Sequence, residues 1–212
     1  KQFGFNLGGQ VERHAFGNAV TRMKDAGMTW VKFLVPWGPS YNADHRAHLI
    51  REAHEHGFKV LLSVRGSPEH AHEKYFAEFS SFVASLAKLG ADAIEVWNEP
   101  NLSREWESSH ISPISYTALL RQSYIAIKHA NPDTMVISAG PAPTGYYEGC
   151  HPEGCDDLPF IQTIVSGGGL NYADCVGIHY NEGLVSPTKS NGDPRKNAGH
   201  YTRYYQTMVD TY

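Results

Sequence analysis

The residues best placed to do chemistry are Asn98 and Glu99, within the run IEVWNEPNL at positions 94–102. The apolar part of this run predicts a β-strand, and Pro100 ends it directly after the two polar residues. In parallel α/β folds the helices cover both sheet faces, so reactive groups gather at the carboxyl ends of the strands. We therefore expect Glu99 to exchange protons with a ligand, with a pKa raised by partial desolvation beside Trp97. A solvated loop carboxylate is the alternative.

This run resembles the acid/base segment of clan A glycoside hydrolases, most closely the family thirty-nine group of β-xylosidases, iduronidases and exopolysaccharide hydrolases. The resemblance extends to Trp106, Tyr116, 131–132, 138–141 and 178–180. It implies a (β/α)8 TIM barrel and a retaining glycoside hydrolase that cleaves O-glycosidic bonds of a poly- or oligosaccharide. Glu99 would be the general acid/base.

The resemblance also implies roles for three polar residues near the strand ends. Asn98 would hydrogen-bond the sugar hydroxyl next to the anomeric carbon, with a turn amide as the alternative. His179 and Tyr180, at the end of the sixth predicted strand, would lie near Glu99 and orient it or the sugar. A core histidine satisfied by the backbone is the alternative for His179.

Three further candidates follow the second and third predicted strands and the acid/base loop. Arg65 could pair with the nucleophilic carboxylate and keep it ionised, or form a structural salt bridge. Trp37 and Trp106 could stack on the flat C–H faces of sugars, and ordinary packing explains them equally well. Asn6, after the first predicted strand, is a weaker polar candidate.

A retaining mechanism needs a second carboxyl group as nucleophile. By resemblance it belongs on strand seven, which the sequence does not reach. Glu182 is the only acid close after the sixth predicted strand and is a stand-in candidate, whereas Glu95 is expected to be structural. We expect the working protein to have a further segment of roughly 60–100 residues that supplies strands seven and eight and the nucleophile.

Strand and helix signals alternate along the 212 residues without a linker. We expect one catalytic barrel domain over 1–212 with its last two strands missing. An open doubly wound sheet is the alternative, but the run NLGG at 6–9 lacks the glycine spacing of a dinucleotide site. Strands are predicted at 3–7, 30–35, 58–64, 93–97, 134–138 and 175–179, and helices at 15–25, 42–56, 74–89, 115–130, 158–165 and 201–212.

Composition and charge limit the classes of partner that this chain is expected to bind. The formal net charge is −4 and no basic stripe occurs, so a nucleic-acid partner is not expected. No apolar run approaches the length of a membrane span. A carbohydrate substrate is expected, with no cofactor and no metal. Two other classes are kept: a non-catalytic carbohydrate-binding barrel, and a metal-dependent barrel hydrolase using some of the 12 histidines, such as His45 and His48.

The pairing of the three cysteines indicates whether the protein works in an oxidising compartment. Cys150 and Cys155 flank a short loop, where a disulfide, free thiols or a metal site with His151 are all open. Cys175 is expected to be a buried small hydrophobe. A secreted or periplasmic location is expected, with a cytoplasmic one as the alternative.

Overall fold

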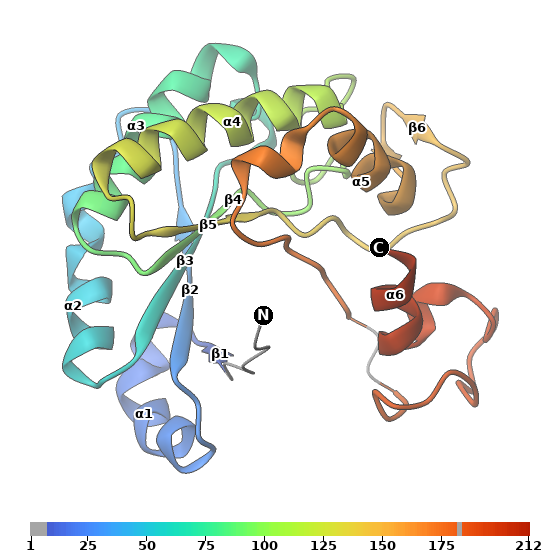
Figure 1. The fold of residues 1–212 in the computed structure, drawn as a ribbon, viewed down its shortest axis with the longest axis horizontal. Coiled ribbons are helices and arrows are strands. Elements are labelled where there is room, and N and C mark those ends of the chain that lie inside the picture. Colours follow the sequence, from blue (N-terminus) through green and yellow to red (C-terminus); the bar gives the residue numbers. More distant parts are fainter. Residues whose placement is uncertain (1–7, 182–183) are drawn as a thin grey trace.

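The computed structural model describes residues 8–181 and 184–212. A five-stranded, all-parallel sheet has its strands in chain order, β1-β2-β3-β4-β5. Figure 1 shows this sheet as a curved arc with α1 to α5 on its outside. Parallel strands in chain order with outer helices form an arc of a (β/α) barrel, so the predicted fold class is confirmed. The strands are Gly8–Gln10, Trp30–Pro36, Lys59–Arg65, Ala93–Val96 and Met135–Ser138.

The main helices follow the predicted pattern closely. The buried residues of α3 include Phe76, Phe79, Val83 and Leu86, which share one face as their spacing predicts. In α4, Ser112 caps the first turn by accepting hydrogen bonds from two backbone N–H groups. The helices are α1 Phe16–Asp25, α2 Ala47–Glu55, α3 Phe76–Lys88, α4 Pro113–Ala130, α5 Asp157–Ser166 and α6 Tyr205–Thr211.

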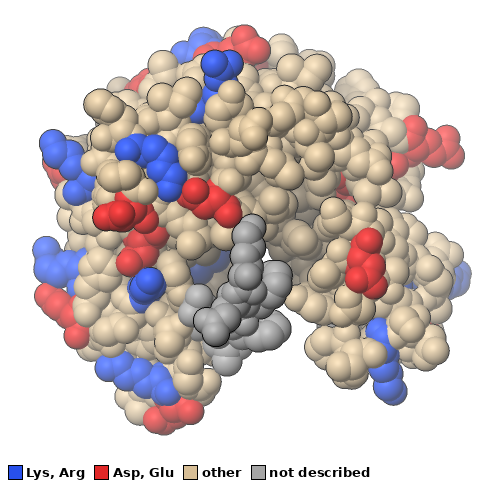
Figure 2. All heavy atoms as spheres, in the orientation of Figure 1, with Lys and Arg blue, Asp and Glu red and all other residues tan. Residues whose placement is uncertain are grey.

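The two faces of the sheet have different surroundings. In β2, Val31, Phe33 and Val35 are buried, whereas Leu34, between them, is 43% exposed. The inner face of the arc borders an apolar cavity of about 500 Å³, whose lining includes Trp30 and Leu61. The space-filling view in Figure 2 shows the surface hollowed between the arc and the C-terminal segment. The described residues therefore bury the outer face of the sheet and leave the inner face open.

One predicted strand differs from the structure and another is not tested by it. The prediction at 3–7 lies outside the described residues, and β1 follows it at Gly8–Gln10. The prediction at 175–179 is wrong in extent, because this segment makes only one β-bridge, Ile137 to Cys175. Asp174 takes part of the pairing with its side chain, which accepts the N–H of Val136 at 2.7 Å.

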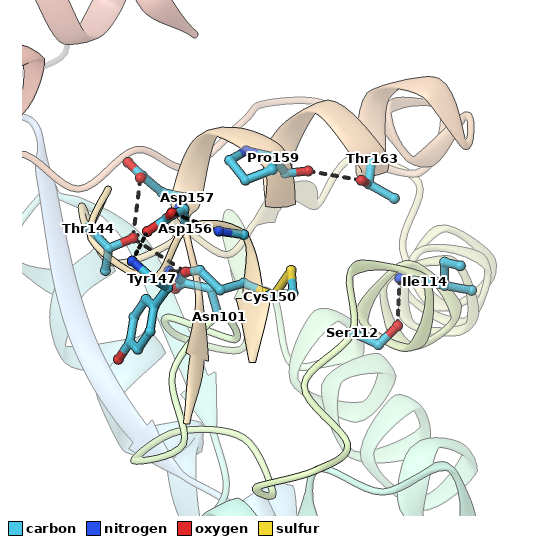
Figure 3. Close-up of a disulfide and its surroundings, with 12 residues drawn as sticks. Asn101, Ser112, Ile114, Thr144, Tyr147, Cys150, Asp156, Asp157, Pro159 and Thr163 are labelled. Carbon is cyan, nitrogen blue, oxygen red and sulfur yellow. Dashed lines mark hydrogen bonds between the residues drawn. A yellow bond between two sulfur atoms is a disulfide. The ribbon is translucent and has the colours of Figure 1, made fainter. Parts of the chain in front are cut away.

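A small hairpin, β6 Cys150–His151 and β7 Gly154–Cys155, follows the end of β5. A disulfide joins Cys150 to Cys155 (Figure 3). Of the three alternatives left open by the sequence, the structure therefore shows the disulfide. Cys175 is exposed beside the open sheet edge, so the prediction that it is buried is wrong. Its Sγ lies 3.5 Å from the sulfur of Met135.

Two buried aspartates hold the region around α5. Asp156 accepts four backbone hydrogen bonds from the 145–149 loop, and these lower its pKa although burial alone would raise it. Asp157 accepts hydrogen bonds from the hydroxyls of Tyr201 and Tyr212. Burial and the Asp157 carboxylate raise the pKa of both phenols. The Asp157 contacts fasten the C-terminal segment to the barrel arc.

No helix in the described ranges has both the length and the apolar character needed to cross a membrane.

Candidate active site

Glu99 projects from an unusual piece of backbone just beyond β4. Trp97 and Glu99 have positive φ values of 73° and 40°, a conformation that costs about 1–3 kcal/mol for such residues. Hydrogen bonds hold it in place: the Trp97 N–H donates to Val64 O at 2.9 Å, and the Glu99 N–H donates to Gly140 O at 3.2 Å. The turn lies between β3 and the end of β5, and it leaves Glu99 only 6% exposed.

Both carboxylate oxygens of Glu99 have a cationic or ionisable partner. His179 Nδ1 lies 2.9 Å from Oε1, and the Arg104 guanidinium donates to Oε2. Burial would raise the pKa of Glu99, but the hydrogen bonds and charges of His179 and Arg104 outweigh it and lower the pKa. The prediction of a raised pKa is therefore wrong for the described residues, because it counted desolvation and missed Arg104.

His179 lies beside Glu99, as the sequence predicts, and a glycine makes room for it. A Cβ added at Gly140 would lie 2.6 Å from Cδ2 of the imidazole. Gly140 also supplies the carbonyl that accepts the Glu99 N–H. The end of β5 thus positions both members of the Glu99–His179 pair.

A polar cavity of about 410 Å³ opens at this end of the sheet. Glu99 and a second acid, Glu105, both border it, and Arg65 and Lys32 provide positive charge. Asn98 also borders it, is half-buried, and makes no hydrogen bond from its side chain to the described residues. The remaining lining residues are Gln10, Leu34, Ile178, His179, Tyr180 and Asn181.

Arg65 pairs with a carboxylate that the sequence did not single out. Its Nη1 donates to Oε2 of Glu105 at 2.6 Å. Glu105 and Arg104 follow Glu99 on the same loop, and no spacing rule marks them. Deeper in the arc, Lys32 donates to Glu95 at 2.6 Å, which agrees with the structural role predicted for Glu95.

Neither predicted tryptophan platform offers its ring to the cavity. Trp37 is 3% and Trp106 0% exposed, so both pack in the core. Trp37 lies edge-on to Phe79 at 5.1 Å, and Trp106 lies edge-on to Trp97 at 5.5 Å. The aromatic side chains that would suit sugar stacking instead form the wall behind the Glu99 loop.

Tyr180 borders the cavity, but its hydroxyl donates to Arg203 O at 3.3 Å and its ring lies against Tyr205. It connects the end of the sixth predicted strand to the C-terminal segment. Glu182 and Asn6, the two weaker candidates, lie outside the described residues.

Asn101, two residues after Glu99, holds the loop in place through its side-chain hydrogen bonds. The sequence did not predict this role. Its amide donates to the carbonyls of Ala142 and Cys155, both at 3.0 Å, and accepts the Ala142 N–H at 2.8 Å. Asn101 is fully buried. Asn101 thereby connects the loop after β4, the loop after β5 and the disulfide hairpin (Figure 3).

Comparison with known proteins gives matches among solved structures only; no family model and no curated protein matches the chain. An endo-1,4-β-mannanase from Rhizomucor miehei is 13% identical, with a TM-score of 0.57 over 85% of this chain and 67% of that one. A protein described as a glycoside hydrolase is 13% identical, with a TM-score of 0.50 over 68% and 55%. The endoglucanase of Thermotoga maritima gives 18% identity and a TM-score of 0.47 over 62% and 45%.

At these identities the matches establish the fold. The chain shares the barrel architecture of the first two of these glycoside hydrolases, and it covers 67%, 55% and 45% of the length of the three solved structures.

Proposed function

We propose that this chain carries the acid/base side of a retaining glycoside hydrolase, with Glu99 as the general acid/base. The observation that supports this most is a buried glutamate at the end of a barrel strand, bordering a polar cavity and paired with His179. Enzymes of this fold place their chemistry at this end of the strands. The finer resemblance, to the family thirty-nine group, rests on the sequence motif alone.

The lowered pKa of Glu99 suits the second step of such a reaction, in which this residue acts as a base. A general acid must hold a proton before the glycosidic bond breaks, whereas the paired Glu99 has a lowered pKa. A nucleophilic carboxylate about 5–5.5 Å away would raise that pKa by like-charge repulsion. Once the nucleophile is consumed in the glycosyl-enzyme, Arg104 and His179 would favour ionised Glu99, which then acts as base toward water.

The nucleophile is proposed to come from a segment that completes the barrel. The open edge at β5 and the apolar inner cavity are the surfaces that such strands would cover. Among the described residues, Glu105 is the other carboxylate on the polar cavity, and it accepts a hydrogen bond from Arg65. If the 212 residues cleave a glycoside alone, Glu105 and Glu182 are the residues to replace first.

Asn98 and Tyr180 are proposed to contact the sugar, Asn98 through its amide and Tyr180 as part of the cavity wall, since the Tyr180 hydroxyl already donates to Arg203 O. The Asn98 amide borders the cavity and makes no hydrogen bond to the described residues, which supports a hydrogen bond to a substrate hydroxyl. A secreted or periplasmic location is proposed from the disulfide between Cys150 and Cys155, since such bonds persist in oxidising compartments.

The product's anomeric configuration tests the proposed class. Proton NMR of the first sugar released should show the configuration of the substrate, before mutarotation. An inverted product would contradict the retaining mechanism. The absence of hydrolysis across β-glucan, β-mannan and β-xylan oligosaccharides, together with tight binding of one of them, would instead favour a carbohydrate-binding barrel.

A further inference from the structure

A second group of ligand-type side chains lies on the active-site loops but outside the polar cavity. His72 belongs to the connection between β3 and α3, and Glu107 and His110 belong to the connection between β4 and α4. One ligand atom from each residue lies within 4.8 Å of the other two. Across 8–181 and 184–212, this is the only such group of three His, Cys, Asp or Glu side chains.

The three side chains are accessible and already close. The imidazole centroids of His72 and His110 are 5.3 Å apart, and Glu107 Oε2 lies 3.6 Å from Nδ1 of His110. The side chains of Glu107 and His110 are 38% and 52% exposed. None of the three is fully buried, so an ion could reach them from solvent.

We propose that His72, Glu107 and His110 bind a divalent transition-metal ion of the Zn²⁺ type. Two imidazole nitrogens and one carboxylate oxygen match the ligand preference of such an ion. A tetrahedral Zn²⁺ with bonds of about 2.1 Å keeps its ligand atoms about 3.4 Å apart. Rotation of the two exposed side chains can close the group to that size. His72 and His110 also line a cavity of about 500 Å³, from which water can supply the fourth ligand.

The existing contacts of His72 do not oppose binding. Its Nδ1 accepts a 3.2 Å hydrogen bond from the exposed N–H of Lys74. An ion that takes this lone pair would leave the Lys74 N–H facing water. Replacing an exposed protein hydrogen bond by one to water costs little, because water satisfies the freed N–H with a bond of similar strength.

The ion would act as a clamp on the loop that carries Glu99. The indole of Trp97 donates to Glu105 O at 2.8 Å, and that of Trp106 donates to His110 O at 3.0 Å. These two bonds already hold the loop backbone on both sides of Glu107. A metal bridge from His110 to His72 would add a tie to the neighbouring β3–α3 connection.

Zn²⁺ binding to the metal-stripped protein tests this site without any activity assay. Isothermal titration should show one Zn²⁺ per chain, and Co²⁺ should give the visible absorption bands of a tetrahedral site. His72→Ala and His110→Ala should each weaken Zn²⁺ binding by at least about tenfold. His129→Ala, which removes an exposed histidine at the end of α4, is the matched control and should leave the affinity unchanged.

Three results would overturn the proposal: no saturable Zn²⁺ binding by the parent protein, equal affinities in the parent and both variants, or an equal loss in His129→Ala. If an alanine variant does not fold by circular dichroism, His72→Gln and His110→Gln repeat the comparison with a side chain of similar size. Because the readout is metal affinity, failure here leaves the proposed glycosidase function untouched, and the reverse also holds.

Discussion

The end of β4 and the segment after β5 start from similar short apolar runs and reach different structures. Strand β4 has a hydrogen-bonded neighbour on each side, and all four of its residues are buried. Among residues 8–181 and 184–212, the segment at 175–179 has a neighbour on one side only, and there Val176 and Ile178 are 46% and 41% exposed. An apolar run paired on both sides therefore forms a full strand here, whereas the run at 175–179, paired on one side, makes a single bridge. The polar residues Asn98 and Glu99 follow the fully paired strand.

The largest effect is expected for Asn101→Ala, at the closed end of the sheet. The substitution leaves the buried Ala142 carbonyl and N–H without their partner, whereas the Cys155 carbonyl keeps its hydrogen bond from the Thr144 hydroxyl. We expect a loss of roughly 3 kcal/mol in the free energy of unfolding. Denaturant unfolding measures it against Asn171→Ala, an exposed residue near the open edge that should change stability by less than about 0.5 kcal/mol. Equal effects would break the comparison.

A somewhat smaller effect is expected for Gly140→Ala. The added Cβ meets His179 at 2.6 Å, so the ring must move away from Glu99. Overpacking of this kind costs about 1–3 kcal/mol. Gly17→Ala is the control, because its Cβ would meet nothing within 4 Å in α1 and should stabilise the helix by about 0.5–1 kcal/mol. A stable Gly140→Ala protein with an unchanged imidazole NMR titration would show that the end of β5 does not position His179.

The hairpin after β5 should contribute less. Replacing Cys150 and Cys155 together by serine opens a short loop and should cost roughly 2 kcal/mol. Cys175→Ser, at the open edge, should change stability by less than about 0.5 kcal/mol. Alkylation without reductant, read by mass spectrometry, should modify one thiol in the parent protein. Three modified thiols would remove the disulfide and the argument for an oxidising compartment.

The smallest expected effect is on the pH dependence of stability in Arg104→Ala. The folded-state pKa of Glu99 is lowered, so Glu99 stabilises the fold above its unfolded-state pKa, and this is lost as pH falls through the folded-state pKa. Without Arg104 that pKa rises and the contribution shrinks. The stability difference between pH 7 and acidic pH should therefore be smaller in Arg104→Ala than in Arg51→Ala, an exposed control. An equal difference would contradict the charge assignment.

The sequence predicts the elements and the position of Glu99 well, because periodicity and strand ends are local properties. The buried residues of α4, with Tyr116, Leu119 and Ile127 among them, share the helical spacing of one face, which the sequence alone shows. The contacts of Arg104 and Glu105 could not be predicted, since a loop's backbone path decides which side chains meet the cavity. For Trp37 and Trp106 the sequence left sugar stacking and core packing equally open, because both require the same residue type, and the structure shows packing.

The most direct test of the central claim compares two leaving groups in the active, complete protein. Glu99→Gln should lower turnover of an oligosaccharide by about 10²–10⁴-fold, because its poor leaving group needs a proton. For an aryl glycoside with an activated leaving group, the rate of glycosidic bond cleavage should fall far less, since that group departs unprotonated. Glu69→Gln, at an exposed position, should change neither. If Glu99→Gln lowers both substrates equally and mildly, Glu99 is not the general acid/base.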